Sequence, residues 1–190
     1  MILHHTGGRE STTIRGDSMT AIRMISLAFI SLALALLAAT APARAEDFAS
    51  MLSQYRRAHG LSAVKVDAQL TAVAERQARA MAARSVMDHN VAGAFGTRIA
   101  DVPVGGAGEN LAEGTTSWAD TLQRWEDSPG HNSNLLLASA THVGVAVAYD
   151  SKNVPFRAMV IARKLSAEEV RMRQEPPVLG GWWMIGGSTR

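Results

Sequence analysis

The chain has 190 residues, with 19 Lys and Arg against 17 Asp and Glu, and no cysteine. This length suits a single domain with a tail. The lack of cysteine excludes a disulfide scaffold, a cysteine-ligated zinc site, an iron–sulfur cluster and a thiol nucleophile.

The N-terminal segment has the pattern of an export signal. Residues 27–39 read LAFISLALALLAA, preceded by Arg23 and followed by the small-x-small triplet at residues 43–45. As a helix this run spans about 20 Å, which is short of the roughly 30 Å hydrocarbon core of a membrane. We therefore expect residues 1–45 to be a signal peptide whose true start is Met19. Cleavage near Ala45 would give a periplasmic or extracellular protein, and an uncleaved anchor is the alternative.

The excess positive charge lies in this leader. Residues 1–45 contain four basic and two acidic residues, which leaves 15 of each in the rest of the chain. A neutral domain without a basic block gives no electrostatic basis for binding nucleic acid, so we expect no nucleic-acid partner.

The first half of the mature chain is predicted to be helical and then irregular. Apolar residues at helical spacing predict a helix over residues 48–59, with Arg56 and Arg57 on a solvated face, and a longer helix capped by Asp67. Residues 87–114 are rich in glycine and are expected to form a long loop, with a short helical turn near residues 95–100.

The second half is predicted to contain two helices, a hairpin and a polar helix. Ser117 caps a helix that directs two tryptophans to the core, and Ser128 caps a short helix with Pro129 at its first position. Alternating apolar residues at 143–149 and a β-branched run at 154–162 predict an antiparallel hairpin. A short polar helix up to Gln174 and a Gly/Trp-rich tail follow, so that residues 166–190 lie outside the main domain.

Three residues form the leading chemical constellation. His89 follows the long helix, Glu109 lies in GGAGENLAEG, and His131 lies in SPGHNSNLL. Two imidazoles and a carboxylate can hold zinc or a similar divalent ion while leaving a position for water. The same three groups also suit a buried polar network that only organises a cleft, and the sequence leaves both interpretations open.

A serine hydrolase triad of Ser128, His131 and Asp127 is a weaker interpretation. Ser128 and His131 are one helical turn apart around a proline, and capping of the helix already explains the serine.

The order of four motifs resembles the CAP superfamily, also called SCP domains, which is named after cysteine-rich secretory proteins, antigen 5 and pathogenesis-related 1. The motifs are a histidine after an alanine-rich helix, a GEN-[LI]-A-x-G segment, a W-x-x-S-P-G-H-x-x-N-[LI]-L segment and a G-V-x-V strand. The residues that carry them are His89, Glu109, Asn110, Trp125, Ser128, Pro129, Gly130, His131, Asn134, Gly144 and Val145. In its lack of cysteine the chain resembles the bacterial members of this superfamily more than the disulfide-rich animal proteins.

The resemblance implies an α+β fold over residues 46–165, a three-layer α-β-α sandwich with a small antiparallel sheet. It also implies a cleft with a tetrad of two histidines and two glutamates. His89, Glu109 and His131 match three members, but Ser128 occupies the position of the second glutamate. Glu126 is about 100° from Trp125 around the helix and is not expected to replace it. One carboxylate should hold a divalent cation less tightly than two.

Three functions follow from the resemblance as expectations. The first is an exported, monomeric module whose cleft of His89, Glu109, Ser128 and His131 binds a small apolar ligand such as a lipid or sterol, a divalent zinc-like metal at His89 and His131, or both. The second is a metal-assisted envelope hydrolase with Glu109 as the candidate catalytic base. The third is a non-catalytic module that interacts with an envelope component. Asn110, Trp125, Pro129, Gly130 and Asn134 are expected to be structural.

The C-terminal tail is a separate question. Trp182, Trp183, Met184 and Ile185 lie between glycine pairs. They would either pack on the domain, remain disordered or contact a membrane surface, and four apolar residues are few for a stable anchor.

Overall fold

The computed structural model describes residues 45–175 of the chain. The predicted signal peptide before Ala45 and the tail from residue 176 onwards lie outside this range. The described chain is helical over residues 45–58 and then contains, in order, β1 (Lys65–Val66), α2 (Ala68–Arg84), α3 (Phe95–Ile99), β2 (Val104–Glu113), α4 (Trp118–Glu126), α5 (Pro129–Leu135), β3 (His142–Tyr149), β4 (Pro155–Lys164) and α6 (Ala167–Gln174). No helix within residues 45–175 combines the length and apolar character needed to cross a membrane.

The strands form one sheet in the order β1-β3-β4-β2. The predicted hairpin is β3 paired with β4, and β2 pairs antiparallel with the other edge of β4. The sheet is mixed, not wholly antiparallel as expected, because the two-residue strand β1 pairs parallel with the start of β3. The strand β2 is left at an open edge, where helices from both sides can approach it.

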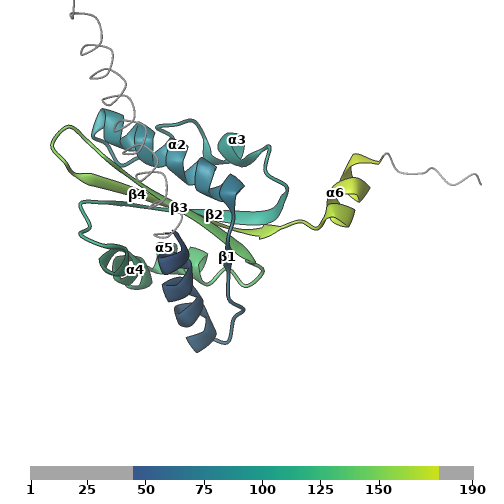
Figure 1. Ribbon diagram of the computed structural model, residues 1–190. Helices are drawn as coiled ribbons and strands as arrows, with labels where there is room; N and C mark the ends of the chain where they lie inside the picture. The colour runs from purple at the N-terminus through teal and green to yellow at the C-terminus, as the bar shows by residue number, and fades with distance from the viewer. Residues whose placement is uncertain (1–44, 176–190) are drawn as a thin grey trace, which may run out of the picture. The chain divides into compact units, whose positions relative to one another are not determined.

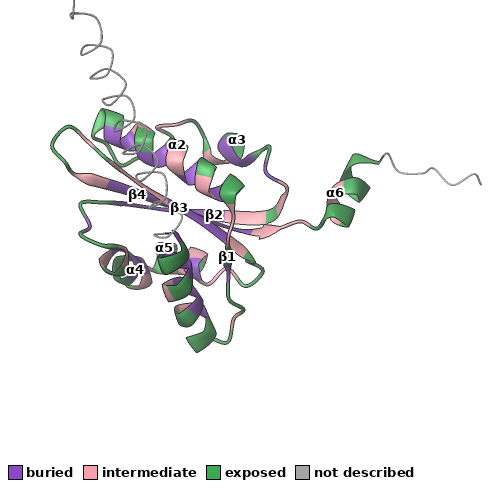
Figure 2. Ribbon diagram, viewed as in Figure 1, coloured by how far each residue is buried: buried purple, intermediate pink, exposed green. Residues whose placement is uncertain are grey.

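Helices cover both faces of the sheet, which confirms the three-layer α+β architecture (Figure 1). Along β4, Phe156, Ala158 and Val160 lie in a core shared with α2. The alternate residues Met159 and Ile161 lie in a second core, with residues of the helix over 45–58, α4 and α5. This period of two is the reason that one strand supplies both cores. Figure 2 shows buried residues gathered along the strands and along α2.

The prediction of a continuous loop over residues 87–114 is wrong for its last part. The strand β2 occupies residues 104–113, although three of its residues are glycines, which weaken strands. At Gly108 an added Cβ would overlap the side-chain amide of Asn134, and at Gly105 it would overlap the guanidinium of Arg163. These glycines therefore permit close approach of side chains to the strand.

The prediction that Arg56 lies on a solvated face is also wrong. Arg56 is fully buried and donates hydrogen bonds to four carbonyl oxygens. Two of these belong to Leu135 and Leu137, at and just after the C-terminal end of α5, where a positive charge is favourable. Burial lowers the pKa of the Arg56 guanidinium. The arginine thus joins the helix over 45–58 to α5.

Candidate functional site

The GEN motif lies on the edge strand β2, and its acidic and amide residues face opposite sides of the sheet. Glu109 pairs with Val160 of β4, and Asn110 pairs with Met159. Because paired residues share a face, Glu109 points toward the layer of α2 and α3 and Asn110 toward the layer of α4 and α5. One dipeptide therefore connects both helical layers at the open edge.

Glu109 is held by Arg98 of α3, a residue that the sequence analysis did not single out. Arg98 Nη1 donates to Glu109 Oε2 at 2.7 Å, and Nη2 donates to Oε1 at 2.9 Å. Only 4% of the Arg98 side chain and 2% of the Glu109 side chain are exposed. This is the bidentate geometry in which a guanidinium and a carboxylate bind most strongly. No helical or strand periodicity marks Arg98, so only its nearness to the GEN motif could have drawn attention to it.

His89 is the next member of this cluster. Its Nδ1 atom lies 2.8 Å from Oε1 of Glu109, while 56% of the side chain is exposed. The turn that carries His89 is fixed at three backbone carbonyls. Gln77 donates to the carbonyl of Asp88 at 2.6 Å, and Arg98 donates to those of His89 at 3.0 Å and Gly93 at 2.9 Å. The ring is therefore hydrogen-bonded at Nδ1, and much of the rest of the side chain is exposed to solvent.

His131 approaches from the opposite layer, on α5. Its Nδ1 atom lies 3.0 Å from Oγ of Ser128. Burial lowers the pKa of His131, and the charge that His89 can carry lowers it further, so the neutral ring is favoured. The backbone of His131 is joined to the strand that carries Glu109 through a hydrogen bond from Asn110.

The Ser128 side chain does not cap α5, which corrects the sequence-based expectation. Ser128 occupies the N-cap position, but its hydroxyl makes no capping hydrogen bond and contacts His131 instead. Asp127 accepts a hydrogen bond from Gln123 at 3.1 Å, so it does not complete a triad with Ser128 and His131. The hydroxyl contacts Nδ1 of the ring, whereas in the Ser-His-Asp triad that nitrogen faces the carboxylate.

Amide side chains fasten α5 to the edge strand. Asn134 donates to the backbone carbonyl of Glu109 at 3.1 Å and to the side-chain oxygen of Asn110 at 2.8 Å. Asn110 in turn donates to the backbone carbonyl of His131 at 3.0 Å. Trp125 is buried and donates to the carbonyl of Leu111 at 3.0 Å. These bonds set the position of His131 relative to β2.

The donor set at the cluster does not match a zinc site. Within residues 45–175, no three His, Asp or Glu side chains are arranged to hold a metal ion. Glu109 contacts His89, but Oε1 accepts two hydrogen bonds, Oε2 accepts one, and the side chain is buried. Glu126 makes no hydrogen bond or ion pair with His89 or His131 among the described residues, and burial and then Asp127 raise its pKa. Two imidazoles remain, one fewer protein ligand than catalytic zinc sites use.

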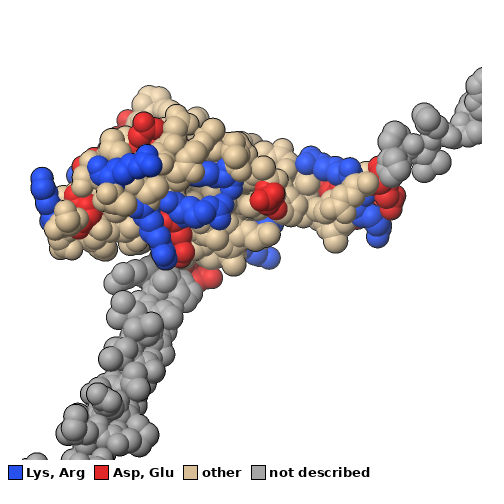
Figure 3. Space-filling view, turned by 90° about the horizontal axis from the view of Figure 1, so that it is seen from above, with Lys and Arg blue, Asp and Glu red and all other residues tan. Residues whose placement is uncertain are grey.

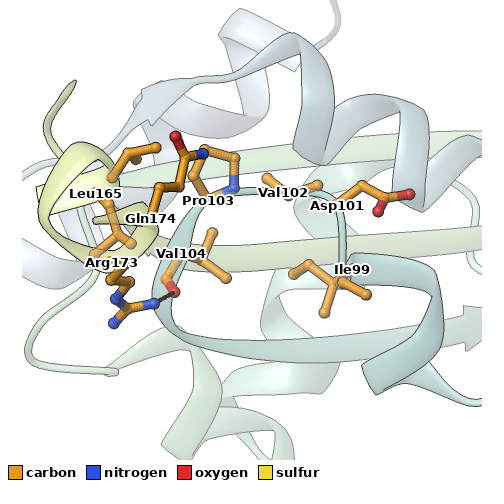
Figure 4. A pocket seen from close by; sticks show the side chains of 10 residues that line it. Ile99, Asp101, Val102, Pro103, Val104, Leu165, Arg173 and Gln174 are labelled. Carbon is orange, nitrogen blue, oxygen red and sulfur yellow. Dashed lines mark hydrogen bonds between the residues drawn. The ribbon is translucent and has the colours of Figure 1, made fainter. Parts of the chain in front are cut away.

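A separate pocket of about 400 Å³ lies between the segment after α3 and helix α6 (Figure 4). Ile99, Val102, Val104 and other apolar residues line it, and Arg173 reaches across to donate to the carbonyl of Val104 at 3.3 Å. None of its lining residues belongs to the histidine cluster.

In the view of Figure 3, basic and acidic side chains are interspersed on the visible face.

Comparison with known proteins identifies the family. The profile of the CAP family, described as the cysteine-rich secretory protein family, matches residues 49–160, which is more than half of the chain. The chain therefore belongs to the CAP family, and its lack of cysteine agrees with the bacterial branch.

Several bacterial proteins are similar to this chain. It is 28% identical over 95 residues to the uncharacterized protein YkwD of Bacillus subtilis, a match that covers 47% of this chain and only 37% of YkwD. An extracellular SCP-domain protein of Bacillus anthracis is 26% identical, with a TM-score of 0.57 over 65% of this chain and 41% of that chain. An outer surface protein of Borrelia burgdorferi shares the fold, with a TM-score of 0.58, 19% identity, and coverage of 63% and 92% of the two chains.

Proposed function

We propose that this protein is an exported CAP-domain module that binds a small ligand in its histidine-lined cleft without turning it over. One observation carries the proposal: Arg98 and His89 occupy both oxygens of Glu109, and 2% of that side chain is exposed. A general base must come within hydrogen-bond reach of the proton that it removes. A carboxylate that is held and buried in this way is unsuited to that role.

The alternative of a metal-assisted hydrolase loses support for the same reason. It needs a held metal and a free base, and the cluster offers two imidazoles and no free carboxylate. A divalent ion could still be held by His89 and His131 alone, because both rings are anchored at Nδ1 and Nε2 can coordinate a metal wherever the ring proton is on Nδ1. We place no reaction step on such an ion.

The proposed ligand is a small, largely apolar molecule such as a lipid or sterol. The resemblance to the CAP family supports this ligand class. The rings of His131 and Trp125 have centroids 6.4 Å apart, and Trp125 is buried, so the polar cluster lies against the hydrophobic core. Binding sites for small molecules commonly combine apolar surroundings with a few polar groups that fix the ligand. A module that displays the fold to an envelope component is the second candidate.

Export is part of the proposal. It is supported by the signal-like residues 27–39 and by the printed description of the Bacillus anthracis relative as an extracellular protein. We propose a monomer in the periplasm or outside the cell, with no nucleic-acid partner because acidic and basic residues balance after residue 45.

Turnover assays separate binding from catalysis. The mature domain is incubated with casein and with peptidoglycan, and wild type is compared with Glu109→Gln. We expect no cleavage by either protein. Cleavage by wild type that is lost in Glu109→Gln would instead establish Glu109 as a base and refute the proposal.

Zinc titration by calorimetry, with the His89→Ala/His131→Ala variant as control, tests the metal alternative independently. Equal binding by both proteins would exclude the two histidines as ligands.

A further inference from the structure

The ion pair between Arg98 and Glu109 bears on which nitrogen of the His89 ring carries the proton. Its guanidinium carries only donors, and two of them face the two oxygens of Glu109. Both oxygens must therefore act as acceptors in these bonds, and the carboxyl group has no proton to offer His89.

The hydrogen bond between Glu109 Oε1 and His89 Nδ1, at 2.8 Å, then fixes the tautomer of the ring. Its proton must belong to Nδ1, since the carboxylate oxygen only accepts. A neutral imidazole carries one N–H, so Nε2 of His89 keeps its lone pair. Because 56% of the His89 side chain is exposed, that lone pair is available to a ligand.

His131 is not constrained in this way. Its Nδ1 lies 3.0 Å from Ser128 Oγ, and a hydroxyl both donates and accepts. Either tautomer of His131 is therefore compatible with its anchor. One imidazole is therefore fixed as an acceptor at Nε2, whereas the tautomer of the other is not fixed by its anchor.

From this asymmetry we infer that Arg98 is a positioning residue, acting through Glu109 to present Nε2 of His89 as a hydrogen-bond acceptor, and that the ligand's polar group is a hydroxyl. A hydroxyl can donate to the Nε2 lone pair of His89. A carboxylate only accepts, so it would leave the His89 lone pair unmatched. The ligand class rests on the binding function proposed above, whereas the role of Arg98 does not.

The tautomer is measured by long-range ¹H–¹⁵N correlation on histidine-labelled mature domain, at a pH where the imidazoles are neutral. The expected result for wild type is the Nδ1–H form of His89. In Arg98→Met the carboxylate is no longer held in position, and we expect a mixture of tautomers, with partial restoration in Arg98→Lys. The Nε2–H form in wild type would overturn the inference without any variant having to fold.

The ligand class is tested by titrating dodecanol and dodecanoate, which share one alkyl chain and differ in the polar group. We expect wild type to bind dodecanol about tenfold more tightly, a typical effect of one matched against one unmatched polar contact. The preference should disappear in His89→Ala. Equal or tighter binding of dodecanoate would overturn the hydroxyl assignment. If neither probe binds while His89 is the Nδ1–H form, the proposed apolar-ligand function fails and the positioning role of Arg98 stands.

Discussion

The two candidate histidines, His89 and His131, come from opposite layers and are anchored by different chemistry. His89 is held by a buried carboxylate that is itself clamped by Arg98, whereas His131 is held by the neutral hydroxyl of Ser128. A catalytic zinc site would call for a third protein ligand beside the two rings, and the Glu109 carboxylate is instead held by Arg98. A buried ion pair therefore orients His89, whereas a neutral hydroxyl contacts His131.

The largest expected effect on stability comes from replacing Arg98, which anchors the His89 side of this comparison. Arg98→Met leaves the Glu109 carboxylate buried without its partner, and we expect the free energy of unfolding in urea to fall by about 3–5 kcal/mol. The double variant Arg98→Met/Glu109→Leu should recover most of the loss, because the unpaired buried charge is gone.

The matched control is Arg79→Met. It breaks an i,i+4 pair with Glu75 whose side chains are 76% and 42% exposed, so it should cost less than about 1 kcal/mol. Similar losses for Arg98→Met and Arg79→Met would show that the buried pair is not the anchor described here.

The position of His131 is tested through the contact between α5 and β2. In Gly108→Ala the new methyl group would overlap the amide of Asn134, and we expect a loss of about 1–3 kcal/mol. Gly130→Ala is the control, since nothing lies within 4 Å of the added Cβ in α5. Similar effects of Gly108→Ala and Gly130→Ala would show that α5 does not dock on this strand through Asn134.

The smallest expected effect is a pH dependence carried by His131. Its pKa in the folded protein is lowered below 6.5, first by burial and then by His89. The unfolded chain therefore binds the proton more readily, so stability is complete above pH 6.5 and declines as the pH falls from there toward the folded-state pKa.

Urea titrations of wild type and His131→Gln over that pH range measure this effect. The variant should show a flatter profile, and an unchanged slope would show that His131 is not the titrating group.

The sequence predicts most helices and the β3–β4 hairpin because those segments have clear periodicity. The edge strand β2 is not predictable in this way: its glycines remove the alternation, and they are needed for the close approach of Asn134 and Arg163. The strand β1 has two residues and exists through its pairing with the start of β3.

The candidate site is predictable in its motif residues but not in the residue that controls them. His89, Glu109 and His131 lie in recognisable motifs. The structure brings His89 and Glu109 into contact and joins His131 to the same strand through Asn110. Arg98 and Arg56 are buried arginines whose partners are distant backbone carbonyls or a strand carboxylate. A local sequence pattern cannot indicate such burial, since it depends on how separate elements meet.

Native mass spectrometry of the protein, purified from its own cells, tests the central claim most directly. We predict a non-covalently bound small molecule on wild type that is absent from His89→Ala/His131→Ala. A wild-type protein without bound ligand that cleaves casein or peptidoglycan in a Glu109-dependent manner would contradict the claim that this cleft binds and does not turn over its ligand.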